Sequence, residues 1–188
     1  MRSEAAVVGR GGEGTSMTLE IKTADELVDP GLEARWAVRR TAREGEILQR
    51  ILRTFLDRGG PVLVEEVAAA FPDRPPETVW DTLVAMDDED LIQIREGRVE
   101  IAYPFSAIPT PFVVRLADGK ERFACCAIDA LGMAPMVGQR VHIRSKCHDC
   151  GAALELSVAP DGPDQGAEGV LVWVGKQGEG ERRLMTSL

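Results

Sequence analysis

Residues 122–158 read RFACCAIDALGMAPMVGQRVHIRSKCHDCGAALELSV, and the pattern of this stretch decides the fold that the sequence predicts. Apolar and polar residues alternate over 141–144 and again over 154–158. A period of two is typical of strands with one buried face. The apolar segment 123–131 is either a buried helix or a strand that runs into one. The stretch therefore predicts strands packed beside a buried apolar segment.

The sequence after residue 104 continues in the same way. Residues 112–116 (FVVRL) are predicted to form a strand, and Asp118-Gly119 a turn. Residues 160–169 are predicted to be a loop from their composition, and residues 170–174 a short buried strand.

Before residue 104, apolar residues recur at helical spacing in three segments. They are Ile47, Leu48, Ile51, Leu52, Phe55 and Leu56, then Val64, Val67, Ala68 and Phe71, then Val79, Trp80, Leu83, Val84 and Met86. Gly59-Gly60 ends the first helix, and Pro75-Pro76 suits the first turn of the third. A period of two returns at 92–95 and 99–103, with Glu96-Gly97 as the turn between them. Three short helices and a hairpin in this order resemble a winged helix.

These patterns predict an α+β protein. Residues 1–16 are rich in Gly and lack a hydrophobic period, so we expect a disordered tail. Residues 17–103 are predicted to form a helical, winged-helix-like domain. Residues 104–188 are predicted to form a small domain of mixed β-sheet and helix that carries all four cysteines. Trp36, Trp80 and Trp173 are expected to pack in the core.

Composition and charge narrow the classes of function. The chain has 188 residues, 44% of them apolar, with 22 Lys and Arg against 31 Asp and Glu. Nucleic-acid binding depends largely on phosphate neutralisation, so a net charge of −9 argues against a nucleic-acid partner. The third helix would read DNA in a winged helix, yet residues 75–92 hold six acidic residues and no basic one. We expect no membrane span and a cytoplasmic protein, because no long apolar run or signal peptide is present.

The four cysteines gather in two pairs, Cys125-Cys126 and Cys147-His148-Asp149-Cys150. Thiolates select soft or borderline metals such as zinc, Cu(I) or mercury. The C-x-x-C pair resembles half of a zinc knuckle, with Cys125 or Cys126 and His148 or His142 as further candidate ligands. Redox chemistry and inert buried thiols are the alternative interpretations.

Cys126 and Asp129 are three residues apart, so on a helix they share one face. A carboxylate raises the pKa of a neighbouring thiol, which does not suit simple activation of a nucleophile. The pair makes chemical sense if the cysteine holds a cation and the acid moves a proton. Alternatively, Cys126 is buried core and Asp129 caps a turn.

Residues 122–158 resemble the central segment of the organomercurial lyase (alkylmercury lyase) family. That family carries an aromatic-Ala-Trp-Cys-Ala-Leu-Asp sequence, followed by a small apolar run, a turn and a Ser-x-Cys strand end. The matching residues here are Phe123, Ala124, Cys126, Ala127, Ile128, Asp129, Leu131, Gly138, Val141, Ser145, Cys147 and Gly151. The helices before residue 104 are similar to the winged-helix-like unit that precedes the catalytic part in that family.

The resemblance implies that the protein breaks a carbon–mercury bond by protonolysis. Cys126 would be the thiolate that attacks mercury, and Asp129 would carry the proton to carbon and later ligate Hg(II). The products would be a hydrocarbon and thiolate-bound Hg(II). No organic cofactor is implied. The expected partner is a small organometal or a soft metal ion.

The sequence departs from the family pattern in its cysteines. The family uses a second catalytic cysteine downstream, whereas no cysteine follows Cys150 here, and the segment after it looks too short for that element. Cys125 replaces the tryptophan, and Cys150 is an addition. A second sulfur would then come from Cys125, Cys147 or Cys150.

Three functions therefore stay open from the sequence. The first is a lyase with a relocated second thiol. The second is a non-lyase metal-binding protein or repurposed enzyme in which Cys126, Asp129, Cys147 and Cys150 supply ligands for zinc, copper or mercury. The third, disfavoured by charge, is a winged-helix metal sensor.

Overall fold

The computed structural model describes residues 45–164, 166–167 and 169–172. Its first elements are helix α2 (Glu46–Arg58), strand β1 (Val62–Leu63), and helices α3 (Val64–Ala69) and α4 (Pro76–Asp88). Apolar side chains of α2 face the core, and Gly59, at φ 66°, ends the helix while its N–H donates to Phe55 O. The helical spacing of the sequence therefore predicted these helices correctly.

Strands β2 (Ile92–Arg95) and β3 (Arg98–Ala102) form the expected antiparallel hairpin. Glu96 and Gly97 both have positive φ, 49° and 73°, as a two-residue turn between twisted strands requires. Arg95 and Arg98 are paired directly across this turn. The turn and the register thus agree with the sequence pattern.

The remaining strands are β4 (Phe105–Ser106), β5 (Val113–Arg115), β6 (Glu121–Ala124), β7 (Val141–Lys146), β8 (Ala153–Ala159) and β9 (Gly162–Pro163). Among the described residues the strands lie in the order β1-β3-β4-β6-β5-β7-β8-β9, with β2 on β3, and every pair is antiparallel. Because β3 pairs with β4, hydrogen bonding continues across the predicted domain boundary at 103/104. That division, like the winged-helix likeness, stays a prediction.

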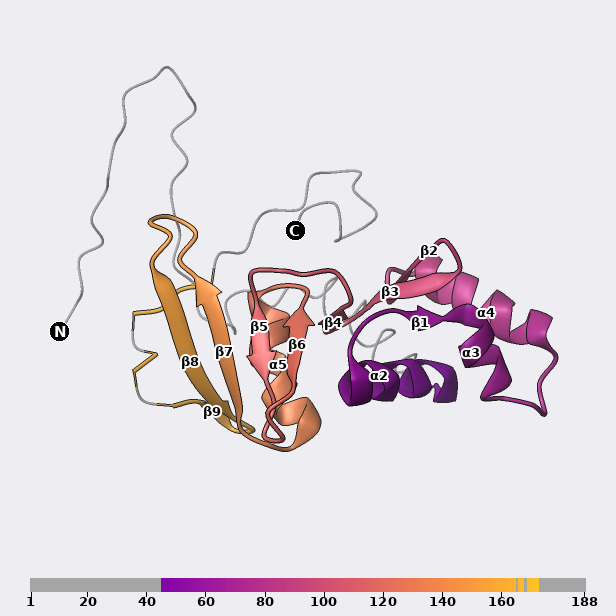
Figure 1. The fold of residues 1–188 in the computed structure, drawn as a ribbon, viewed down its shortest axis with the longest axis horizontal. Helices are drawn as coiled ribbons and strands as arrows, with labels where there is room; N and C mark the ends of the chain where they lie inside the picture. The colour runs from indigo at the N-terminus through magenta and orange to yellow at the C-terminus, as the bar shows by residue number, and fades with distance from the viewer. Residues whose placement is uncertain (1–44, 165, 168, 173–188) are drawn as a thin grey trace, which may run out of the picture. The chain divides into compact units, whose positions relative to one another are not determined.

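Helix α5 (Ala127–Val137) packs against β5 to β9 of this sheet (Figure 1). Ala130, Met133 and Ala134 are its buried residues, and Gly138 ends it in the left-handed conformation. Of the two alternatives that the sequence left open for residues 123–131, the structure shows the strand that runs into a helix. This geometry places the end of β6 and the start of α5 next to one another, with only two residues between them.

A cluster of buried apolar side chains runs through these elements. Its largest fully buried members include Phe55, Phe105, Leu48, Ile51, Leu83, Ile92 and Met133. The predicted α+β class is confirmed by this arrangement of helices on an antiparallel sheet. No helix within the described ranges is long and apolar enough to cross a membrane.

Two predictions about burial were wrong. Trp80 lies on the outer face of α4 with 44% of its surface exposed, because the buried side of that helix is made by Val79, Leu83 and Met86. Residues 170–172 form no strand, and Leu171 is 67% exposed. The predicted loop at 160–169 also contains the short strand β9. The predictions for residues 1–16, Trp36 and Trp173 fall outside the described residues.

Candidate active site

Cys126 lies at the junction between β6 and α5. It is the N-cap of α5 with extended backbone angles, φ −148° and ψ −179°, rather than a residue of the helix itself. Its Sγ accepts the backbone N–H of Asp129 at 3.4 Å, which satisfies one of the amides left unpaired at a helix start. The cysteine therefore has a capping role that the helical-spacing argument did not foresee.

The Asp129 side chain turns back toward the same sulfur. The Cys126 thiol donates a hydrogen bond to Asp129 Oδ2 at a distance of 3.0 Å. Asp129, the third residue of α5, thus reaches back to the cap residue from the position that a capping box uses, and here it accepts the thiol hydrogen of Cys126. This contact places a thiol proton between a sulfur and a carboxylate oxygen.

The surroundings of Cys126 favour its protonated form. Burial is the largest cause, and with the charge of Asp129 and the hydrogen bond to it the pKa of the thiol is raised to about 11. Hydrogen bonds from the backbone N–H groups of Asp129 and Ile128 act in the opposite direction but do not prevail. At neutral pH Cys126 is therefore a thiol, and its proton lies on the hydrogen bond to Asp129.

Cys125 is adjacent in sequence but has a different environment. Its side chain is only 6% exposed, and its thiol donates to the backbone O of Phe105 at 3.3 Å. Burial, followed by the charges of Asp129 and Cys126, raises the pKa of this thiol far above its ordinary value. Cys125 is thus a buried thiol bonded to the backbone of β4, whereas Cys126 is half-buried.

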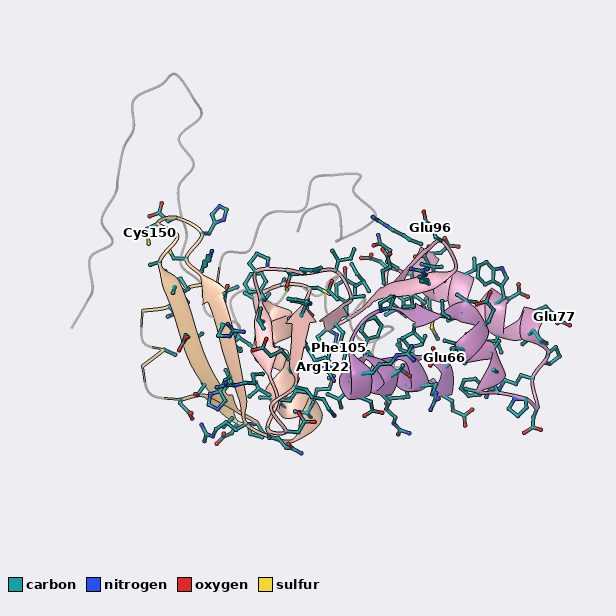
Figure 2. All side chains as sticks on the ribbon, in the orientation of Figure 1. Glu66, Glu77, Glu96, Phe105, Arg122 and Cys150 are labelled. Atoms are coloured by element: carbon teal, nitrogen blue, oxygen red, sulfur yellow. The ribbon has the colours of Figure 1, made fainter. Side chains whose placement is uncertain are left out.

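Cys147 and Cys150 lie in the turn between β7 and β8, and Figure 2 shows Cys150 at the end of this hairpin. Hydrogen bonds from the backbone N–H groups of Cys150 and Asp149, and from the Cys150 side chain, lower the pKa of the Cys147 thiol. Cys150 is exposed and Cys147 is half-buried. The two cysteines form a second, separate thiol pair.

The structure does not gather the four predicted ligands into one site. Within the described ranges, no group of three or more His, Cys, Asp and Glu side chains lies close enough to hold a metal ion. Cys126 meets Asp129, and Cys147 meets Cys150. Their assignment as metal ligands stays a prediction, and the geometry divides it into two pairs.

The sequence of this region matches one known protein family. Residues 105–187 match the model of MerB, alkylmercury lyase, and this range contains β4 to β9, α5 and all four cysteines. Residues 105–187 are similar to alkylmercury lyases. The resemblance of residues 122–158 to this family is thereby confirmed.

Individual relatives extend the comparison. The alkylmercury lyase of Staphylococcus epidermidis is 38% identical over 116 residues, which are 62% of this chain and 51% of that protein. The alkylmercury lyases of Streptomyces lividans and Bacillus cereus are 34% and 32% identical over similar lengths. This chain therefore spans about half the length of the curated alkylmercury lyases that it matches.

A solved structure supports the same fold. The crystal structure of the mercury-bound form of MerB2 aligns with a TM-score of 0.56 at 22% identity, covering 70% of this chain and 66% of that one. At this identity the likeness concerns the fold alone. It agrees with the helices and antiparallel sheet described above.

One residue that supports the strand before Cys126 was not singled out from the sequence. Arg122, in β6, is 6% exposed, and its Nε donates to the backbone O of Phe55 at 2.7 Å and of Leu56 at 2.9 Å (Figure 2). These carbonyls belong to the last turn of α2, where Phe55 O also accepts the Gly59 N–H. Arg122 therefore fixes the strand that leads into Cys126 against a helix far away in sequence. No local pattern marks an arginine as buried.

The other polar candidates are peripheral. His142 is exposed on β7, and its Nδ1 is 2.9 Å from Ser157 Oγ. His148 and Asp149 are exposed in the turn after β7. A surface hollow of about 550 Å³ lies over β5, β7 and β8, and it is lined by neither Cys126 nor Asp129. None of these features competes with the Cys126–Asp129 pair as a place for chemistry.

Proposed function

We propose that this protein is an organomercurial lyase-like enzyme that breaks a carbon–mercury bond by protonolysis at Cys126 and Asp129. The observation that carries the proposal is the 3.0 Å hydrogen bond from the Cys126 thiol to Asp129 Oδ2, in a chain whose residues 105–187 match the alkylmercury lyase family. Mercury is a soft metal that binds thiolate sulfur, and the same contact holds the proton that carbon must receive. Both requirements of the reaction therefore meet in one pair of side chains.

The first step transfers the thiol proton within the pair. As the Cys126 sulfur forms a bond to mercury, its proton moves along the existing hydrogen bond to Asp129. The charge repulsion that raises the pKa of Cys126 disappears once the carboxylate is neutral and the sulfur is bound to a cation. Metal binding thus generates a carboxylic acid beside the bound organomercurial.

The second step delivers this proton to carbon. Asp129 protonates the carbon as the carbon–mercury bond breaks, and the bonding pair of electrons stays with the carbon. In total, R–Hg–SR′ and the Cys126 thiol give R–H and Cys126-S–Hg–SR′, so the atoms and the proton balance. A positioned general acid of this kind contributes rate both by proximity and by its proton.

The second sulfur on mercury comes from a small thiol in this proposal. Cys125 is buried and bonded to Phe105 O, and Cys147 and Cys150 form a separate pair in the β7–β8 turn. A cellular monothiol such as glutathione can approach the half-buried Cys126 and accept Hg(II) by ligand exchange. This chemistry requires a reducing compartment, so the proposed location is the cytoplasm.

The direct test is to incubate the reduced protein with methylmercury and excess glutathione and to measure methane. We expect methane from the parent protein and none from Cys126→Ser or Asp129→Ala. Asp129→Ala should still bind methylmercury through its intact sulfur. Asp161→Asn, which changes an exposed acid in the β8–β9 turn, is the matched control and should form methane at the parent rate.

Two results would overturn the proposal. One is tight methylmercury binding by the parent protein without methane, which is the behaviour of a non-lyase metal-binding protein. The other is methane formation by Cys126→Ser at the parent rate, because the proton and the mercury would then be handled elsewhere.

A further inference from the structure

The C-x-x-C turn between β7 and β8 is not used by the chemistry proposed above. The last pair of the β7–β8 ladder, Lys146 with Ala153, leaves residues 147–152 as the loop. The Cys147 N–H donates to Ala152 O at 2.8 Å, and the Gly151 N–H donates to Cys147 O at 2.9 Å. Gly151 adopts φ 71°, a conformation that glycine enters without strain. The backbone between the two cysteines is therefore closed into a defined turn.

This turn directs both sulfurs to the same place. The Cys147 sulfur accepts hydrogen bonds from the backbone N–H groups of Cys150 and Asp149, and from the Cys150 thiol. The Cys150 thiol proton thus lies between two sulfurs. A soft cation that replaces this proton would meet two donors without a rearrangement of the strands, and the backbone N–H groups would stabilise the thiolate charge.

The number of donors limits which ion fits. A structural zinc site needs four ligands, and no third His, Cys, Asp or Glu joins this pair within the described residues. Soft ions such as Cu(I), Ag(I) and Hg(II) need only two thiolate ligands. Thiolates also bind these ions in preference to harder metals. The exposure of Cys150 also allows incoming thiols to reach the ion and exchange it.

We propose that Cys147 and Cys150 form a two-sulfur chelate for a soft cation of low coordination number, Cu(I), Ag(I) or Hg(II), separate from the Cys126–Asp129 pair. This site does not depend on carbon–mercury bond cleavage. Binding releases the thiol protons of both cysteines and forms two sulfur–metal bonds, with no oxidation or reduction. The ion is held at the hairpin end, where another thiol-bearing molecule can take it.

The experiment uses the full chain with Cys126→Ser, so that the outcome is independent of the proposed lyase reaction. The reduced protein is mixed with Hg(II) and a large excess of a monothiol, freed of small molecules, and analysed for metal. We expect one mercury ion per chain, with two sulfur neighbours by X-ray absorption. A second thiol on the same turn raises affinity by its effective concentration, so Cys150→Ser in this background should lose about 10²–10⁴-fold in affinity.

Further variants separate the sulfur pair from its neighbours. Cys147→Ser with Cys150→Ser leaves buried Cys125 as the remaining cysteine and should retain no mercury in the monothiol excess. His148→Asn should leave affinity unchanged, and Zn(II) should not be retained. The proposal is overturned if Cys150→Ser retains mercury like its parent, if His148→Asn loses it equally, or if a four-coordinate zinc ion binds as tightly.

Discussion

The replacement Asp129→Asn tests the electrostatics of the candidate site. In the native protein the Cys126 thiol has a pKa of about 11 against an ordinary value of 9.0. Burial is the largest cause and remains in the variant, whereas the Asp129 charge is removed. The pKa of Cys126 should therefore fall to a value between 9 and 11.

The size of the effect follows from the thiolate population. At pH 8 a thiol of pKa 11 is about one part in a thousand ionised, and complete return to 9.0 would raise this about 90-fold, which is an upper bound. Because thiolate reactivity falls with pKa, the alkylation rate gains only about threefold for each unit of decrease. We thus expect a rate increase of about 3- to 10-fold at pH 8.

The assay is a pH–rate profile of iodoacetamide alkylation, in which peptide mass spectrometry follows Cys126 separately from the other three cysteines. Asp161→Asn is the control for a general change in charge, and it should leave the profile of Cys126 unchanged. If Asp129→Asn left the apparent pKa of Cys126 at about 11 or raised it, the argument that Asp129 holds the thiol proton would fail. Loss of methane formation in the same variant would then need another explanation.

The remaining predictions concern packing and the second thiol pair. Arg122→Met should lower the free energy of unfolding by about 2–4 kcal/mol, because it removes the charged hydrogen bonds that the buried guanidinium makes with two carbonyls of α2, whereas Arg144→Met, which breaks an exposed ion pair with Glu121, should cost less than about 1 kcal/mol. Urea titration of both variants measures this difference, and equal effects would contradict it. Met133→Ala should cost about 2–5 kcal/mol by the same titration because Met133 is fully buried, and a cost below 1 kcal/mol would disagree. At pH 7, Cys147 should be alkylated faster than Cys125 or Cys126, since its pKa is lowered and theirs are raised. Quantitative peptide mapping after a short pulse gives the order, and prior labelling of Cys126 would oppose it.

Residue spacing was sufficient to predict most of the regular structure. Helices α2 and α4 and the β2–β3 hairpin were predicted from the spacing of apolar residues and from turn residues. Both signals depend only on residues that are close together in the sequence. The exposure of Trp80 was missed because the third helix carries apolar residues on more than one face. Which face is buried depends on tertiary contacts that a period does not specify.

The candidate site was predictable in its residues but not in its geometry. The three-residue spacing predicted that Cys126 and Asp129 are in contact. The structure shows this contact, but it forms at a helix cap rather than on a helix face. Cysteine is not among the usual capping residues, so no start signal marked it. The separation of Cys147 and Cys150 from Cys126 depends on a hairpin whose end is fixed by strand register.

Because Cys126 caps α5, ligand binding at its sulfur can be detected at a nearby backbone amide. The same sulfur that would receive a metal also accepts the amide hydrogen of Asp129 at the first turn of α5. When that sulfur is occupied, its acceptor strength changes, and the protection of this amide against deuterium must change with it. Exchange at the first turn of α5 would therefore record ligand arrival even for a compound that is bound and never cleaved.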